Sequence, residues 1–261
     1  MKRFWAAALA MALLCWGAPA QAHRASVSVN IVPGGVVCLT VDDGYGAASI
    51  ERVLKALRRE GVHATFFLVG DALKANQKLW RQAVRDGNEI CYHTMHHQDM
   101  RNMSDSAIRR DVKKWNKLAK EVLGKDYEIP KLVRLPGGGG NTSKRLGKLF
   151  HAMGYEIIGW SVDTYTGAIR KGESITRYIK RNTRNGSIVL THFNTKDSKA
   201  LKEYIHWLNR HHTLMTVSQA LALEEGKEGR IAASVAANSL ETADKPLLSH
   251  NLLLPLRLIL V

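Results

Sequence analysis

The sequence predicts an α/β fold, a distorted (β/α) barrel with about seven parallel strands in a single domain. From residue 36 onward, short apolar runs alternate with longer stretches of helical periodicity, which is typical of a parallel sheet with crossover helices. The length of 261 residues suits one such barrel. Polar clusters follow the ends of five predicted strands, the edge at which barrels collect functional side chains. These three observations favour a barrel over a doubly wound sheet.

The first strand is expected at residues 36–41, a continuous apolar run too short for a surface helix. An Asp-Asp-Gly sequence ends it abruptly. Residues 47–60 then place apolar side chains on one helical face and basic side chains on the other, and Gly61 fits the C-terminal cap. The chain therefore begins with one strand and one helix.

The same alternation continues to residue 217. Further strands are expected at residues 63–69, 89–92, 132–133, 155–160, 187–191 and 214–217. Helices are expected at residues 72–85, 104–123, 142–153, 174–184 and 199–210, several of them ended by glycine. About seven β/α units result.

Both ends of the chain differ from this core. Residues 1–22 combine Lys2 and Arg3 with an apolar stretch and a small-residue site, the pattern of a cleavable export signal. We expect an N-terminal extension at residues 23–35, a catalytic domain at 36–223 and a mobile tail at 224–261. The mature chain is expected to be secreted or periplasmic and to lack a transmembrane segment.

The mature chain is strongly basic. Lys2 and Arg3 are the only charged residues of the export signal, so cleavage changes the net charge from +15 to +13. This charge favours anionic cell-envelope polymers, glycans or phospholipid surfaces as partners; the alternative is a solvated basic surface without a specific polyanion. The export signal, and the absence of basic runs interleaved with aromatic residues, argue against nucleic acid.

Two cysteines, Cys38 and Cys91, remain after the expected processing. A single pair is not a disulfide framework, and its spacing does not match a zinc ribbon. Two buried thiols are expected, and the alternative is a bridge between neighbouring strands.

Two clusters carry metal-binding chemistry. Asp42 and Asp43 are adjacent at the end of a strand, so their side chains point in different directions and can have different roles. A turn with a helix cap is the alternative explanation. The segment His93-Thr94-Met95-His96-His97 supplies three imidazoles, and two of them with one aspartate form a metal site with open positions. Unpartnered surface histidines are the alternative there.

Three further polar groups follow predicted strands. Arg134 precedes the glycine run 137–140, whose bare amide groups can stabilise an oxyanion; a flexible loop explains the glycines but not the arginine. Asp163 and His192 follow later strands. Together these groups predict a ring of functional side chains at one edge of the sheet.

In chain order, these segments resemble the motifs of the polysaccharide deacetylase family, the carbohydrate esterases related to the rhizobial chitooligosaccharide deacetylase. The resemblance spans roughly residues 36–221. The four clear motifs are Thr-Val-Asp-Asp-Gly-Tyr at 40–45, His-Thr-Met-His-His at 93–97, Arg-Leu-Pro-Gly-Gly at 134–138 and Leu-Thr-His at 190–192. The fourth of the five family motifs, Asp-x-x-Asp-Trp, survives only as Asp163, because Thr166 and Gly167 occupy its last two positions.

The resemblance implies a metal site. It assigns Asp43, His93 and His97, rather than His96, as ligands of a divalent ion, usually zinc, with cobalt or another ion as the alternative. Asp42 is implied as the catalytic base. Because an adjacent cation favours the charged form of a carboxylate, we expect Arg134 to pair with Asp42.

The resemblance also implies an acid and a substrate pocket. His192 matches the family's catalytic acid, and we expect Asp163 to orient it. The Gly137 amide is expected at the oxyanion and Leu190 beside the acetyl methyl. Gly137 replaces an aromatic residue of the third motif, so the pocket is altered, and Trp160 is expected to supply part of its wall.

The function implied is an exported metal-dependent hydrolase that removes N-acetyl groups from amino sugars of an extracellular polysaccharide. The incomplete fourth motif keeps open a non-catalytic glycan-binding relative. A hydrolase of a non-sugar amide or an O-acetyl ester is the other alternative.

Overall fold

The computed structural model describes residues 28–33 and 35–224. The predicted export signal at residues 1–22 and the predicted tail beyond Glu224 lie outside the described residues, as do residues 23–27 and 34 of the predicted extension at 23–35. Within the described ranges, no helix is long and apolar enough to cross a membrane.

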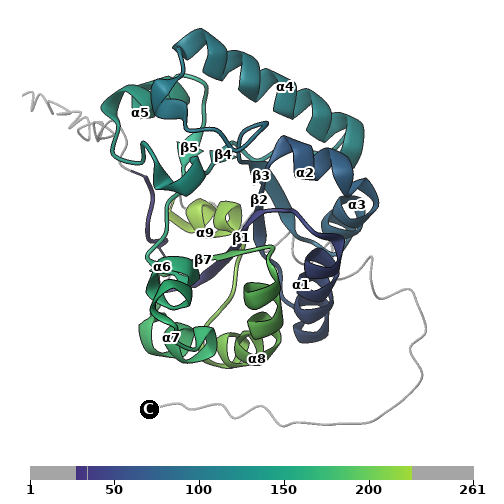
Figure 1. The fold of residues 1–261 in the computed structure, drawn as a ribbon, viewed down its shortest axis with the longest axis vertical. Coiled ribbons are helices and arrows are strands. Elements are labelled where there is room, and N and C mark those ends of the chain that lie inside the picture. The colour runs from purple at the N-terminus through teal and green to yellow at the C-terminus, as the bar shows by residue number, and fades with distance from the viewer. Residues whose placement is uncertain (1–27, 34, 225–261) are drawn as a thin grey trace, which may run out of the picture.

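The core is one curled sheet of seven strands with helices on its outer face (Figure 1). Every neighbouring pair is parallel, in the order β5-β4-β3-β2-β1-β7-β6. The prediction of a distorted barrel with about seven parallel strands is therefore confirmed. The strands are β1 Cys38–Asp43, β2 Thr65–Leu68, β3 Glu89–Tyr92, β4 Leu132–Val133, β5 Glu156–Ile157, β6 Val162–Asp163 and β7 Ile188–His192.

The two edge strands, β5 and β6, do not pair with each other. The N-terminal segment lies along this part of the barrel instead. The Val29 amide donates to the Ile157 carbonyl at 2.9 Å, and the Val32 amide donates to the Gly186 carbonyl at 2.8 Å. One segment thus connects the β5 edge to the start of β7, which accounts for the distortion.

Helices cover the outside of the sheet because each carries an apolar face. Helix α1, for example, buries Ile50, Val53, Leu54 and Leu57, and ends at Gly61, whose φ of 63° allows its amide to bond back to the last turn. The helices are α1 Ala47–Glu60, α2 Gly70–Ala75, α3 Gln77–Arg85, α4 Asp105–Leu123, α5 Lys144–His151, α6 Thr164–Gly167, α7 Ile175–Asn182, α8 Thr195–His211 and α9 Val217–Glu224. The 3-10 turns are η1 Met100–Asn102, η2 Pro136–Gly138 and η3 Ile169–Lys171.

Three sequence predictions about elements were wrong. The expected helix at 72–85 is two helices, which break at Asn76. The short strand β6 was not foreseen. The expected strand at 214–217 makes only a single bridge, from Leu214 to Val37, and helix α9 begins at Val217.

Helix α9 forms a plug in the N-terminal end of the barrel. Val217 and Ala220 belong to one buried cluster with Cys38, Phe67 and Ile188 from the strands. At its N-terminus, the Val217 amide donates to Thr65 Oγ1 at 2.9 Å and the Ser218 amide donates to Glu89 Oε1 at 3.2 Å. Tertiary burial of this short apolar segment overrides its local strand-like pattern.

Cys38 and Cys91 are buried and free, as the sequence predicted. They lie on β1 and β3, and β2 runs between these strands. Neighbouring strands are about 4.8 Å apart, so two spacings exceed the roughly 7 Å limit for bridged Cα atoms. The alternative of a bridge between neighbouring strands is therefore wrong.

Candidate active site

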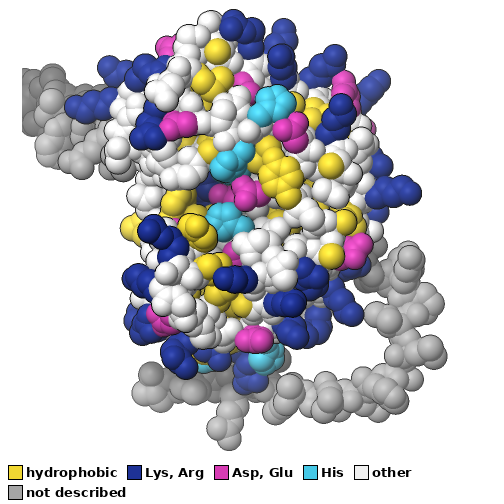
Figure 2. Space-filling model, in the orientation of Figure 1, with side chains coloured by type: hydrophobic (Ala, Val, Ile, Leu, Met, Phe, Trp, Pro, Cys, Tyr) yellow, Lys and Arg dark blue, Asp and Glu magenta, His cyan; other side chains and the backbone are white. Residues whose placement is uncertain are grey.

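The predicted functional side chains meet at the C-terminal edge of the sheet. Asp42 and Asp43 end β1, His93 follows β3, and His192 ends β7. Figure 2 shows histidine and acidic side chains gathered at the centre of this face, with lysine and arginine around the rim. Parallel strands place all their carboxyl ends at one edge, so segments distant in sequence form one site.

Asp43, His93 and His97 form a compact group of ligand atoms. Asp43 Oδ1 lies 3.6 Å from His93 Nε2 and 3.4 Å from His97 Nε2. One ligand atom from each residue lies within 4.8 Å of the other two. Atoms about 2.1 Å from a tetrahedral zinc ion are about 3.4 Å apart, so this spacing fits a metal.

The electrostatics of the group also fit a cation. Asp43 Oδ1 is buried and lacks a hydrogen-bond partner among the described residues. Burial opposes its charge, but His93, His192 and His97 nearby hold the pKa of Asp43 below its ordinary value. Burial and the neighbouring His93 lower the pKa of His97, which favours the neutral imidazole that a metal needs.

The tautomer of His93 is set by its second nitrogen. Nδ1 lies 2.7 Å from the Arg134 carbonyl oxygen, which can only accept, so Nδ1 carries the proton. The lone pair of Nε2 then points toward Asp43 and His97. His93 is 1% exposed, so this orientation is held by packing as well as by the hydrogen bond.

Strained backbone is concentrated at this group. Asp43, Thr94 and His97 have φ values of 79°, 68° and 56°, and they are the only non-glycine residues with positive φ in the part of the chain that the structure describes. Each such residue costs about 1–3 kcal/mol. The surrounding fold sustains this cost where three ligand side chains must converge.

Asp42 lies beside the group and is bound to Arg134. Arg134 Nη1 donates to Asp42 Oδ1 at 2.8 Å, the pairing that the sequence predicted. Asp42 Oδ2 is 3.9 Å from His93 Nε2, so the second carboxylate oxygen faces the ligand atoms. The adjacent aspartates thus have separate environments, one paired with a cation and one among imidazoles.

Arg134 is fully buried and anchored on all sides. Its guanidinium donates to Thr40 Oγ1 at 2.6 Å and to the carbonyl oxygens of Ile158 at 3.1 Å and Gly159 at 2.7 Å. The guanidinium carbon, Cζ, lies 4.3 Å from the centre of the Phe67 ring. A charge held this rigidly fixes the orientation of the Asp42 carboxylate.

His192 lies across the site with its Nδ1 3.7 Å from Asp197 Oδ2. Burial disfavours its charged form, but Asp197, Asp42 and Asp43 outweigh burial and raise the pKa of His192 to about 9. Asp197 is 1% exposed and is held by Asn194, whose side-chain amide donates to Oδ2 at 2.6 Å. The imidazole is therefore protonated at neutral pH.

Asp163 does not take the orienting role expected of it. Its Oδ1 accepts from the Tyr165 amide at 2.8 Å, and its Oδ2 accepts from Thr166 Oγ1 at 2.7 Å, so it caps helix α6. The partner of His192 is Asp197. Sequence reasoning missed Asp197 because it lies between the predicted strand at 187–191 and the predicted helix at 199–210, and not at a strand end.

The three predicted pocket residues differ in their surroundings. Leu190 is buried two positions before His192 and therefore shares its face of β7. Trp160 packs on Gly138, where an added Cβ would lie 2.9 Å from the indole ring. Gly137 has open space around it, and its amide makes no hydrogen bond within the described residues.

Two exposed side chains near the site complete the picture. His96 points away from the ligand group and pairs with Asp71 at 2.8 Å. Tyr165 is 51% exposed, with its ring centre 6.5 Å from that of His192. Tyr165 was not foreseen; it lies within the incomplete fourth motif, two positions before Gly167, which occupies the place of the motif's Trp.

The chain is similar to known deacetylases. Residues 30–158 match the family described as Polysaccharide deacetylase. A peptidoglycan-N-acetylglucosamine deacetylase from Bacillus cereus is 33% identical over 159 residues, which cover 60% of this chain and 72% of that protein. Three other relatives are longer than that Bacillus cereus protein. The regions that match this chain span 66%, 55% and 32% of their lengths.

Solved structures show the same fold. A peptidoglycan N-acetylglucosamine deacetylase in complex with a hydroxybenzamide derivative has a TM-score of 0.66 and 25% identity, covering 75% of this chain and 92% of that chain. A CE4 family pseudoenzyme from Bacillus anthracis has a TM-score of 0.63 and 24% identity, covering 72% of this chain and 65% of that chain. The likeness to the second concerns the fold alone.

Proposed function

The chain belongs to the polysaccharide deacetylase family, and we propose that it is an exported, metal-dependent hydrolase that removes N-acetyl groups from amino sugars of an extracellular polysaccharide. The observation that carries the proposal is that the adjacent carboxylates of Asp42 and Asp43 have different partners. Asp43 lies among His93 and His97, whereas Asp42 is bound to the buried Arg134 and faces the same point. In metal-dependent hydrolysis, one carboxylate can hold the cation while a separate one serves as the base.

Asp43, His93 and His97 would hold the ion. A bound divalent metal lowers the pKa of a water ligand to about 7 and polarises a carbonyl group. The three protein ligands leave positions for water and substrate, as in catalytic zinc sites. His96 is excluded from this role by its pairing with Asp71.

Asp42 is the base. Its Oδ1 is occupied by Arg134 at 2.8 Å, which leaves Oδ2 to accept the proton of the attacking water. The rigid guanidinium holds the carboxylate in place and prevents it from turning away. Arg134 is accordingly a positioning residue for this step.

His192 is the acid. Its protonated imidazole lies beside Asp197 and can give its proton to the departing amine, which then leaves as a free amino group. The Gly137 amide is available to donate to the carbonyl oxygen as negative charge develops there. Leu190 and Trp160 supply an apolar wall for the acetyl methyl group.

Support for the substrate comes from the relatives and from the expected export signal. The Bacillus cereus relative is named for deacetylation of N-acetylglucosamine in peptidoglycan. Removal of the signal would place this chain where such polymers lie. The products would be acetate and a polymer with additional amino groups.

The test is acetate release by the purified mature chain. Peptidoglycan, chitin oligomers, acetylated xylan and a simple acetanilide are incubated with enzyme reloaded with zinc or cobalt, and parallel samples contain a chelator. We expect acetate from the N-acetylated glycans only, and its loss with chelator. Release only from acetylated xylan or acetanilide would overturn the sugar-amide assignment.

A non-catalytic glycan-binding role is the second candidate. It is favoured by the incomplete fourth motif, in which Thr166 and Gly167 replace the family's Asp and Trp. If reloaded protein binds N-acetylated oligomers but releases no acetate from any polymer, this second role is correct.

A further inference from the structure

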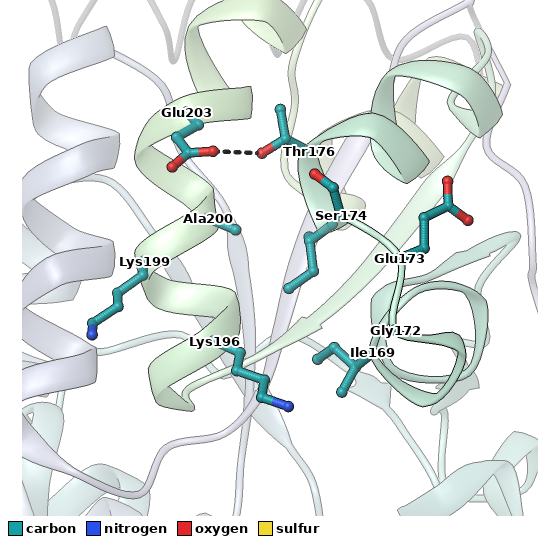
Figure 3. Close-up of a pocket in the computed structure, with 10 residues that line it drawn as sticks. Ile169, Gly172, Glu173, Ser174, Thr176, Lys196, Lys199, Ala200 and Glu203 are labelled. Carbon is teal, nitrogen blue, oxygen red and sulfur yellow. Dashed lines mark hydrogen bonds between the residues drawn. The ribbon is translucent and has the colours of Figure 1, made fainter.

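Two hollows flank helix α8 in the outer layer of helices. One, about 260 Å³, lies between α1 and α8 and is lined by Arg52, Lys55, Ala56, Arg59, Ser198 and Lys202. The other, about 430 Å³, lies between α8 and the segment from η3 to α7 (Figure 3). Helix α8 is thus a ridge between two surface depressions.

The hollow between α1 and α8 is lined by cations without a lining carboxylate. Arg52 is fixed by hydroxyl groups, because its Nε donates to Ser198 at 3.1 Å and its Nη2 to Ser49 at 2.9 Å. Arg59 is partly neutralised by Glu60 at 3.1 Å. Lys55 and Lys202 are exposed and have no carboxylate within ion-pair distance among the described residues.

The second hollow adds a further cation. In Figure 3, the Lys196 side chain extends from α8 toward Ile169 and Gly172. Of the two acidic residues that line this hollow, Glu173 is paired with Arg181 at 3.0 Å, and Glu203 accepts a hydrogen bond from Thr176 at 3.0 Å and keeps its charge. Lys196 has no carboxylate within ion-pair distance among the described residues.

Three lysines of α8 follow one another at intervals of three residues. Lys196, Lys199 and Lys202 are all exposed, and they span about 9 Å of helix at 1.5 Å per residue. Helix α8 starts three residues after His192, and α1 starts four residues after Asp43, so both helices begin at the catalytic edge. The lysine series therefore leads away from the site.

We propose that Lys196, Lys199 and Lys202 of α8, with Arg52 and Lys55 of α1, bind the acidic groups of an anionic glycan strand. This α8 surface rests on the proposed function and refines it, because it selects amino-sugar polymers that also carry carboxylate or other oxyanion groups. Charged residues at a rim govern partner choice and association rate. Neutral oligomers too short to reach the α8 surface gain nothing from it.

Binding to two acidic glycans tests the surface. Polygalacturonate carries carboxylates and dextran sulfate carries sulfates, and uncharged dextran is the blank. The double variant Lys55→Glu/Lys202→Glu is compared with Lys113→Glu/Lys114→Glu, two exposed lysines of α4 on the opposite side of the molecule (Figure 1) with the same charge change. We expect the first variant to lose about tenfold in affinity and the second about twofold or less.

The two polyanions separate the sources of the acidic group. Loss on polygalacturonate alone assigns carboxylates, and loss on both assigns oxyanions in general. Equal losses in the two double variants would overturn the proposal, because binding would then follow net charge alone. Wild-type affinity that does not fall with added salt would also overturn it.

Acetate release separates this proposal from the function on which it rests. For Lys55→Glu/Lys202→Glu, we expect unchanged kcat/KM on a neutral chitin trimer and about a tenfold higher KM on peptidoglycan, whose stem peptides carry carboxylates. Unchanged KM on peptidoglycan would overturn the α8 surface while leaving the deacetylase intact. No acetate from either substrate would overturn the deacetylase, whatever the binding result.

Discussion

The carboxylates at the two ends of the barrel have opposite surroundings. At the C-terminal end, Asp42 is bound to the buried cation Arg134, and Asp43 Oδ1 has no hydrogen-bond partner among the described residues. At the N-terminal end, Glu89 accepts hydrogen bonds from Thr65 and from the start of α9, and burial raises the pKa of Glu89. The C-terminal end thus has an unpartnered carboxylate oxygen that could hold a cation, whereas the N-terminal end is closed by the packing of α9.

The contrast follows from the strand direction. Side chains one residue apart alternate between faces, so Glu89 and His93, four positions apart on the same chain segment, point into the same barrel at opposite ends. The lower end is closed by α9, and the upper end carries Asp43 and His97, whose φ values are positive. Substitutions at the two ends should therefore change different properties, activity at one and stability at the other.

The largest effect is expected at the ligand group. His93→Ala or His97→Ala removes one of three ligands, so we expect metal content near zero and activity reduced to background. His96→Ala is the matched control and should retain metal and activity, because His96 pairs with Asp71. Metal content is measured by elemental analysis of purified protein. Full metal content in His97→Ala would show that the group is not the metal site.

A smaller loss is expected at the base. Asp42→Asn keeps the shape of the side chain but cannot accept the proton, so we expect kcat to fall about 1,000-fold with metal content retained. The thermal midpoint is measured in parallel, because the buried Arg134 loses its charged partner. Wild-type turnover in this variant would contradict the assignment of Asp42.

A moderate effect is expected at Asp197. Asp197→Asn removes a charge that raises the pKa of His192, so the imidazole loses its proton at lower pH. The acid must be protonated, so the alkaline limb of the kcat/KM profile should move to lower pH, with about a tenfold loss at pH 8. Asp163→Asn is the control and should leave that limb in place, because Asp163 caps α6.

The smallest effect is expected at the closed end. The raised pKa of Glu89 means that the folded state holds this proton more tightly than the unfolded state. Its stabilising contribution is complete below the ordinary pKa and is lost as pH rises through the folded-state pKa. The Gln side chain of Glu89→Gln cannot titrate. The free energy of unfolding of this variant, measured by urea titration, should therefore depend less on pH, by about 1 kcal/mol or less, with kcat unchanged. A large fall in kcat would break the comparison between the two ends.

Much of the fold and site was accessible from the sequence. The positions of Asp42, Asp43, His93 and Arg134 at strand ends follow from local apolar runs, because a strand's period and its termination are encoded in a few adjacent residues. Their convergence follows from the parallel sheet. The bounds of α1 were predicted to the residue, since Gly61 marks its end.

The remaining features depend on partners far apart in the chain. The α9 segment resembles a strand until burial inside the barrel, against Cys38 and Ile188, is taken into account. Asp197 looks like an ordinary first-turn acidic residue until α8 is docked beside β7. Neither the helical state of α9 nor the position of Asp197 beside β7 can be predicted from the adjacent residues alone.

The sequence by itself determined the alternation of elements and the strand ends that carry polar groups, because these depend on short-range periodicity and residue chemistry. The choice of Asp43, His93 and His97 as ligands rested on the resemblance to the polysaccharide deacetylases. Only the tertiary structure decided that Asp197, and not Asp163, lies beside His192, and that a helix closes the lower end of the barrel. Those choices depend on which elements pack together, and packing is a property of the whole chain and not of any one segment.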